Sequence, residues 1–197
     1  MYIYDISRNI MDCEPYEGDP QTNTCFIKSI EADDEYNLSE FSMCTHTGTH
    51  IDAPFHYDND GATIDELRLA TFYGKCTVLT LKGILTGEDM EKILPYCRAR
   101  ILFKGNGKGY IQSSAAQVIA DSKVILVGTD ASSISPPFEE DKTHRLLARG
   151  NVAILENLDL TDIHDGSDYT LCAFPIRLDG LEAAPCRAIL LEQEKGF

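Results

Sequence analysis

Apolar and polar segments alternate along the chain in a pattern that predicts an α/β protein. Short runs rich in apolar and β-branched residues are typical of strands. They lie at Met1–Ser7, Thr24–Ala32, Leu38–Cys44, Cys76–Lys82, Arg100–Lys104, Val124–Gly128, Val152–Leu155, Ala173–Leu178 and Arg187–Leu191. Apolar residues at helical spacing predict helices that begin near Thr86, Ser113 and Asp141. Strands and helices alternate through the second half, which is typical of an α/β domain, with extra strands near the front.

Capping residues mark the ends of the expected helices. Thr86 is expected to cap the first helix, because two acidic residues follow it in the first turn. The expected helix Asp141–Arg149 is followed by Gly150, which occupies the position of a left-handed cap. No internal repeat, low-complexity segment or linker divides the sequence, so residues 1–197 are expected to form one domain.

Two segments lack a clear hydrophobic period. Arg8–Thr22 is polar and contains Pro15, Gly18 and Pro20, so it is expected to be a loop and a candidate lid over a pocket. Gly61–Ala70 is ambiguous and is compatible with a short helical turn.

The charge balance argues against several classes of partner. The chain has 17 basic and 32 acidic residues and a formal charge of −15, so nucleic acid and anionic membranes would repel it. No apolar run approaches the roughly 18 residues that a membrane span needs. Met1–Asp5 has no basic region followed by an apolar stretch, which argues against a signal peptide. We therefore expect a cytoplasmic protein that acts on a small molecule.

The seven cysteines do not form a recognisable framework. Their number is odd, their spacing is wide and no C-x-x-C occurs, which disfavours a zinc ribbon or a set of disulfides. They are expected to be reduced, several of them in strands as small apolar residues. Cys44 lies two residues before His46 and is a minor candidate for a metal ligand.

Three of the five histidines fall within the eleven residues from His46 to His56, in the pattern H-x3-H-x-D-x3-H. Imidazoles and a carboxylate are ligands that zinc and similar divalent metals prefer. Thr47–Thr49 and Pro54 disfavour a helix, so the segment is expected to be a turn whose side chains converge. His46, His50 and Asp52 could hold one metal and leave open positions, as in a catalytic site. The alternative is a turn of hydrogen-bonded surface histidines.

The segment from His46 to His56 resembles the H-x-G-T-H-x-D-x-P-x-H signature of the cyclase family of metal-dependent hydrolases. The best-known members of this family are bacterial kynurenine formamidases. Four later segments are similar to blocks of the same family and arrive in the same order. They are Gly61–Asp65, Gly128–Asp130, Asn151–Asp159 and Pro175–Leu178.

The resemblance implies a swivelling β/β/α cyclase-like fold with a mixed sheet, and a homodimer or larger assembly. It also implies a role for each of six residues. His46 and His50 would bind one metal, Asp52 and Glu156 would bridge two metals, His144 would bind the second, and His56 would be the proton shuttle. Glu156 follows the apolar run 152–155, so it ends a strand, where sites form in α/β sheets. Without the resemblance, His144 would be assigned to the surface.

The implied reaction is hydrolysis of the C–N bond of a small amide. For an arylformamidase of tryptophan catabolism, N-formylkynurenine would give kynurenine and formate. Two divalent ions, best matched by zinc with manganese or iron as alternatives, would turn water into hydroxide, since bound water has a pKa of about 7.

The substrate and the catalytic role have alternatives. Kynurenine formamidases place an aromatic residue, commonly Trp, in the N-terminal loop, but this chain has no Trp, and Tyr16 is the candidate to stack on a substrate ring. A cyclic amide or a lactone is the alternative substrate. A non-catalytic protein that binds a metal or small molecule is the second alternative, and His56 argues against it, because pure binding needs no uncoordinated imidazole.

Overall fold

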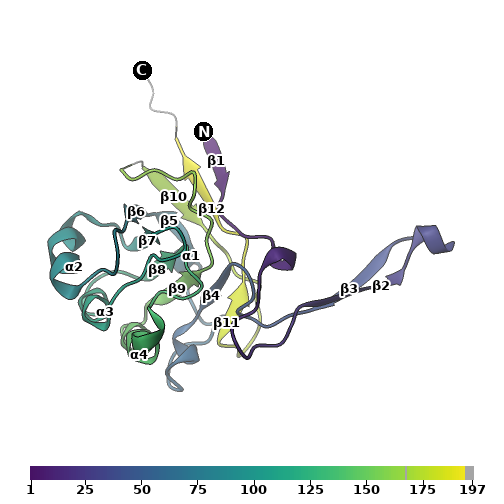
Figure 1. Ribbon diagram of the computed structural model, residues 1–197, viewed down its shortest axis with the longest axis horizontal. Helices are drawn as coiled ribbons and strands as arrows, with labels where there is room; N and C mark the ends of the chain where they lie inside the picture. The colour runs from purple at the N-terminus through teal and green to yellow at the C-terminus, as the bar shows by residue number, and fades with distance from the viewer. Residues whose placement is uncertain (167, 194–197) are drawn as a thin grey trace.

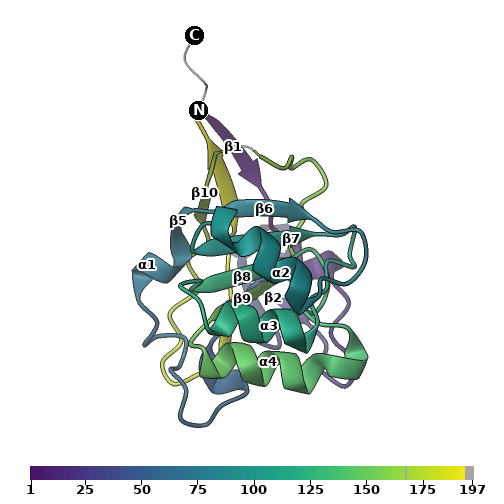
Figure 2. The same cartoon turned by 90° about the vertical axis from the view of Figure 1, so that its left-hand side faces the viewer.

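The computed structural model describes residues 1–166 and 168–193 and arranges most of them in three layers, sheet on sheet on helices (Figures 1 and 2). The central layer is a mixed sheet with the strand order β11-β4-β9-β8-β7-β6. Its strands are β4 (His50–Asp52), β6 (Thr77–Thr80), β7 (Arg100–Lys104), β8 (Leu126–Thr129), β9 (Ala153–Glu156) and β11 (Ala183–Pro185). The strands from β6 to β9 are parallel, whereas β4 and β11 are antiparallel to their neighbours.

An antiparallel sheet and a row of helices cover the two faces of the central sheet. The antiparallel sheet has the order β1-β12-β10-β5. Its strands are β1 (Tyr2–Asp5), β5 (Tyr73–Lys75), β10 (Tyr169–Cys172) and β12 (Ile189–Glu192). Figure 2 shows α2, α3 and α4 side by side on the opposite face. The helices are α1 (Leu69–Phe72), α2 (Gly87–Ile93), α3 (Ser113–Ala120) and α4 (Glu140–Arg149). Among the described residues, none of these helices is long and apolar enough to cross a bilayer.

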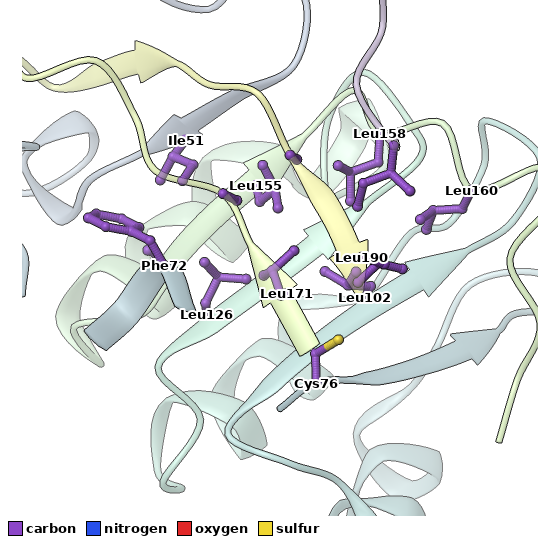
Figure 3. Packing of buried hydrophobic residues seen from close by; sticks show 14 of the residues in the cluster. Ile51, Phe72, Cys76, Leu102, Leu126, Leu155, Leu158, Leu160, Leu171 and Leu190 are labelled. Atoms are coloured by element: carbon purple, nitrogen blue, oxygen red, sulfur yellow. The ribbon is translucent and has the colours of Figure 1, made fainter. Parts of the chain in front are cut away.

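Side-chain alternation along the central strands supplies both cores. On β7, Leu102 faces the antiparallel sheet, while Ile101 and Phe103 face the helices, since successive side chains of a strand point to opposite faces. Figure 3 shows the first core, where Leu171 and Leu190 of the antiparallel sheet pack over the central strands. Both faces of the central strands are therefore buried, which explains their continuous apolar sequences.

A two-stranded arm, β2 (Asn23–Lys28) paired with β3 (Leu38–Ser42), extends away from the layers (Figure 1). Thr24 is paired with Phe41, and Phe26 with Ser39, so Phe26 and Phe41 lie on the same face of the arm. Their exposed fractions are 76% and 57%. A hairpin with bare aromatic side chains and no third strand is at most marginally stable in water by itself.

Most of the expected elements are confirmed, and the exceptions have local causes. The strand expected at Ala173–Leu178 is wrong: the strand is Tyr169–Cys172, and Pro175, which has no N–H to give to a ladder, follows it. The strand expected at Thr24–Ala32 ends at Lys28, because the Ser29 hydroxyl caps a 3₁₀ turn. Short 3₁₀ turns lie at Ile10–Asp12, Ile30–Ala32, Pro54–His56, Leu94–Tyr96 and Pro137–Glu139.

The caps of the helices give one confirmation and one correction. The Thr86 hydroxyl accepts a hydrogen bond from the Asp89 amide, as predicted for an N-cap. Gly150 is not left-handed: its φ is −77°, and Asn151 takes the positive φ of 58° instead. Glycine fits at this position for another reason, because a Cβ atom on Gly150 would lie 2.6 Å from the Cβ atom of Ala120 on α3. The residue thus permits close packing of α3 and α4.

Candidate metal centre

Strand pairing brings the first group of polar side chains together. The histidine segment is a turn only up to Thr49; His50–Asp52 forms β4, so the prediction of a turn over the whole segment is wrong in its second half. His50 and Asp52 are two residues apart and share a face of the strand. His50 is paired with Glu156, the last residue of β9, which puts both side chains on that same face. All three are at most 5% exposed.

Two further histidines reach the same place from other elements. His144 lies on the inner side of α4 with Leu147 and Ala148, one turn further along, and is 3% exposed. His46 comes from the turn that precedes β4. In that turn Gly48 has a φ of +70°, a left-handed conformation that glycine adopts without strain.

The ligand atoms form two groups that share Asp52. His46, His50 and Asp52 make the first group, and Asp52, His144 and Glu156 make the second; within each group the ligand atoms lie within 4.8 Å of one another. The Asp52 Oδ1 atom is 2.9 Å from His46 Nδ1 and 3.3 Å from His50 Nε2. The Glu156 carboxylate is 3.4 Å from His144 Nε2 and 3.7 Å from His50 Nε2.

Two atoms of this cluster are buried without a hydrogen-bond partner. They are His50 Nε2 and Asp52 Oδ1, which approach each other without hydrogen-bond geometry. A buried polar atom that lacks a partner costs free energy, and a charged one costs more. A divalent cation among the side chains would satisfy both atoms, so the donor set fits a metal.

Backbone groups hold the ligands in orientation. The Nδ1 atoms of His50 and His144 lie 2.9 Å from the carbonyl oxygens of Gly48 and Glu140. A carbonyl can only accept, so each Nδ1 carries a proton, and Nε2 is the nitrogen that faces the cluster and could bind a metal once deprotonated. The amide of Ile134 donates a 2.7 Å hydrogen bond to Glu156 Oε1. Contacts of this kind fix the ring orientation of metal-binding histidines.

The carboxylates make the cluster attractive to positive charge. Burial disfavours the charged imidazole of His144, but Glu156 outweighs burial and raises the pKa of His144 to about 9. Asp52 has the same effect on His46 and raises its pKa to about 9. Burial favours the neutral form of Asp52, but His50 and His46 hold its pKa well below the usual value. The potential that retains protons on these rings also attracts metal cations.

His56 differs from the other histidines of the site. It ends the 3₁₀ turn Pro54–His56, and its ring centroid lies 4.4 Å from that of His46 and 6.4 Å from that of His144. It belongs to neither group of ligand atoms found among the described residues. Burial lowers the pKa of His56, so the ring is neutral near pH 7 and can exchange a proton there.

The cluster lines a cavity of about 450 Å³. The loop predicted as a lid, residues 8–22, supplies part of its wall, including Tyr16. The Tyr16 hydroxyl donates a 2.7 Å hydrogen bond to the Glu140 carboxylate, which raises the pKa of Tyr16 to about 12. Four carboxylates outside the ligand groups also line the cavity; they are Glu14, Glu17, Asp19 and Glu140.

One residue that the sequence suggested as a ligand lies outside the ligand groups, and two acids that it did not suggest contact the site. Cys44 is in neither ligand group; its thiol lies 3.4 Å from the Asp19 carboxylate. Glu182 and Glu140 contact the site but were not candidates. Glu182 Oε1 lies 3.3 Å from His46 Nε2. Neither acid stands out among the 32 acidic residues, because their positions depend on strand pairing and helix packing far along the chain.

Comparison with known proteins identifies the family. A family model described as "Putative cyclase" matches residues 4–136. A kynurenine formamidase of Delftia acidovorans (strain DSM 14801 / SPH-1) is 32% identical over 202 residues, covering 95% of this chain and 96% of that protein. The chain belongs to the cyclase family. The resemblance drawn from the histidine segment is therefore confirmed.

Solved structures place this cyclase-family chain among known folds. A structure described as a predicted metal-dependent hydrolase from Bacillus stearothermophilus is 28% identical, with a TM-score of 0.79, and the match covers 96% of this chain and 97% of that one. An isatin hydrolase from Ralstonia solanacearum is 18% identical, with a TM-score of 0.81, and the match covers 98% and 92% of the two chains; it shows the shared fold. These matches confirm the predicted α/β fold with a mixed sheet.

Kinship with these cyclase-family proteins also confirms the predicted class of enzyme. The formamidase at 32% identity and the metal-dependent hydrolase at 28% identity support a metal-dependent amidohydrolase. The buried histidine and carboxylate groups are suited to the metal that such an enzyme uses.

Gly48→Ala tests how far the left-handed turn positions the ligands. The new Cβ atom would lie 3.0 Å from Ile10 Cγ1, and a left-handed alanine is itself strained by about 1 kcal/mol. We expect weaker zinc binding and a lower free energy of unfolding, measured by chelator competition and urea titration. Gly107→Ala is the control, since its φ is +78° but no atom lies within 4 Å of the added Cβ. Equal zinc affinity in both variants would contradict the role of the turn.

Proposed function

We propose that the protein hydrolyses the C–N bond of an N-formyl aromatic amine, as an arylformamidase that converts N-formylkynurenine to kynurenine and formate. The carrying observation is that five candidate ligand side chains, four of them buried, meet beside His56, which belongs to neither ligand group found among the described residues. A binding site alone needs no such imidazole. The kynurenine formamidase among the relatives supports the choice of substrate.

The two groups of ligand atoms suit two divalent ions. His46 and His50 would hold the first ion, His144 would hold the second, and Asp52 and Glu156 would bridge them. Nitrogen and oxygen ligands without thiolate suit zinc, with manganese and iron as alternatives. The unpartnered atoms His50 Nε2 and Asp52 Oδ1 support this assignment.

When bound, the ions would acidify water and polarise the substrate carbonyl. A side chain of the protein would transfer the proton. The water oxygen forms a bond to the formyl carbon, and the C–N bond breaks. His56 takes up the proton that water releases and passes it to the leaving nitrogen, so the products are formate and the free amine. The ring centroid of His56 lies 4.4 Å from that of His46 and 6.4 Å from that of His144, so His56 would be close to a water or a leaving group held by these ligands.

The wall of the cavity favours a substrate with an aromatic ring and an ammonium group. Tyr16 lines the cavity and can stack on a ring. Its lining carries four carboxylates besides the candidate ligands, and no Lys or Arg occurs among the described residues that line it. N-formylkynurenine has an aromatic ring at the scissile amide and a zwitterionic amino-acid end, whose ammonium would face these carboxylates while its own carboxylate points away from them. A purely anionic amide would be repelled.

The remaining expectations complete the proposal. The chain would act as one domain in the cytoplasm. It would form a homodimer through the arm, since the aromatic face formed by Phe26 and Phe41 is exposed and no described residue packs over it. A second copy of the chain would offer an identical arm, and two-fold pairing of identical surfaces is the commonest form of assembly.

Metal content and turnover can be measured on one sample purified without chelator. We expect about two zinc ions per chain by elemental analysis, and formamidase activity that a chelator removes and zinc restores. Kcat/KM should be higher for N-formylkynurenine than for formanilide, which lacks the ammonium. Faster turnover of lactams or lactones would favour the alternative substrate class. A metal-loaded protein without turnover on any of these would contradict the enzymatic proposal.

His56→Ala separates proton transfer from metal binding. We expect the variant to keep its metal and to lose about 10²- to 10⁴-fold in kcat, the usual contribution of a general acid–base. His164→Ala is the matched control, because His164 is exposed and lies outside both ligand groups. Loss of metal from His56→Ala would show that His56 is a ligand and that its assigned role is wrong.

Sedimentation of a double variant tests the assembly. Phe26→Ser with Phe41→Ser alters only side chains that are exposed in the single chain, so the fold should be kept. We expect the parent to sediment as a dimer and the variant as a monomer. Tyr96→Ser is the control, since Tyr96 is 86% exposed but belongs to the body of the molecule. A monomeric parent, or a variant that remains dimeric, would contradict a dimer built on the arm.

A further inference from the structure

One histidine of the cluster lies between two carboxylates. His46 Nδ1 is 2.9 Å from Asp52, inside the ligand cluster, while His46 Nε2 is 3.3 Å from Glu182 Oε1 on the other side. The two nitrogens of the ring therefore have different surroundings. One faces the group proposed to hold a metal, and the other faces an acid that belongs to neither ligand group found among the described residues.

The backbone fixes Glu182 beside the ligand strand. Glu182 directly precedes β11, whose first residue is paired with Asp52 of β4. Its carbonyl accepts a 2.8 Å hydrogen bond from the Ala53 amide, which continues the same ladder. The Thr45 hydroxyl donates a 2.6 Å hydrogen bond to Glu182 Oε1, the same atom that faces His46. The carboxylate is thus held in place by sheet register and by a neighbour of the histidine.

We propose that Glu182 is a positioning residue, which accepts the Nε2 proton of His46 and so directs the Nδ1 lone pair of that ring into the metal cluster. This inference rests on the metal site of the proposed function. A carboxylate that accepts from the outer nitrogen of a metal-binding histidine fixes its tautomer and makes the inner nitrogen more basic. Glu182 would do both for His46.

His46 would then differ from the other histidine ligands in two ways. His50 and His144 are held at Nδ1 by backbone carbonyls and present Nε2 to the cluster. His46 faces the charged Glu182 side chain at Nε2, 3.3 Å away, and faces Asp52 at Nδ1. His50 and His144 are oriented by backbone carbonyls and need no side-chain partner, whereas the orientation of His46 would depend on Glu182.

The exposure of the acids indicates an outer role for Glu182. Its side chain is 32% exposed, whereas the side chains of Asp52 and Glu156 are 3% and 6% exposed. Water can solvate the part of the carboxylate that does not face Thr45 and His46, so Glu182 needs no cation for its own solvation. Asp52 and Glu156 are shielded from water, so their charge does require a compensating cation.

Zinc affinity of Glu182 variants tests the proposal. The probe is zinc itself, titrated into metal-free protein against a chromophoric chelator. We expect Glu182→Ala to weaken binding of the zinc ion that His46 would hold by about 10- to 100-fold, the usual effect of losing such a partner. Glu182→Gln, whose amide oxygen can still accept from Nε2, should lose less. Thr45→Val should weaken binding in the same direction and should add little to Glu182→Ala.

Asp65→Asn is the matched control. The Asp65 carboxylate also accepts a hydrogen bond from a threonine hydroxyl, that of Thr63, and it belongs to neither ligand group found among the described residues. It accepts a second hydrogen bond from the Gly180 amide, which the side-chain oxygen of asparagine can still accept. We expect its zinc affinity to stay within about twofold of the parent. Thermal unfolding of the metal-free proteins identifies any variant that fails to fold, and Glu182→Gln then carries the test because its side chain has the same shape.

Two results would overturn the proposal. Parent-like zinc affinity in both Glu182→Ala and Glu182→Gln would show that Glu182 does not position His46. A changed visible spectrum of the cobalt-loaded Glu182→Gln protein would show that Glu182 is itself a ligand, since an outer residue leaves the ligand set unchanged. Failure of the parent to bind zinc would instead reject the proposed function, so the two failures are distinguishable.

Discussion

The site depends on the burial of two carboxylates that lack enough partners. Asp52 and Glu156 lie at the ends of neighbouring strands, at most 5% exposed, with no Lys or Arg paired to them in the described part of the chain. Removing such charges from water is costly unless opposite charge compensates them. Histidines from a turn, a strand and a helix surround the acids, and their raised pKa values express the same negative potential. Metal ions would supply compensating charge that suits these ligands, and water bound to them would supply the hydrolytic chemistry.

The fold concentrates this charge by means of strand register. Parallel strands end at one edge of the central sheet, and sites in α/β proteins form at that edge. β4 is inserted antiparallel next to β9, so that His50 stands opposite Glu156. Helix α4 then packs over the same face and adds His144. A shift of one residue in the pairing of β4 would turn His50 and Asp52 to the other face, so the register that builds the core also groups the candidate metal ligands.

Sequence patterns predicted the elements whose signals are local. The acids after Thr86 indicated a cap, and the apolar run before Glu156 indicated an acid at the end of a strand; both are confirmed. The pattern could not show that His50–Asp52 is a strand, because three residues are too few to display the alternation of a strand. Glu182 was missed for a related reason: it approaches His46 only through the pairing of β11 with β4, two segments more than 100 residues apart. Gly150 was misjudged because its role is close packing against Ala120, which no local signal reveals.

Anomalous diffraction at the zinc absorption edge, from crystals grown with zinc, would test the central claim most directly. Two peaks are predicted in each chain, at bonding distances of about 2 Å from the ligand atoms. The first should lie among His46, His50 and Asp52, and the second among Asp52, His144 and Glu156. Zinc found only on surface carboxylates, with the buried cluster empty, would contradict the proposal that cations compensate the charge of Asp52 and Glu156.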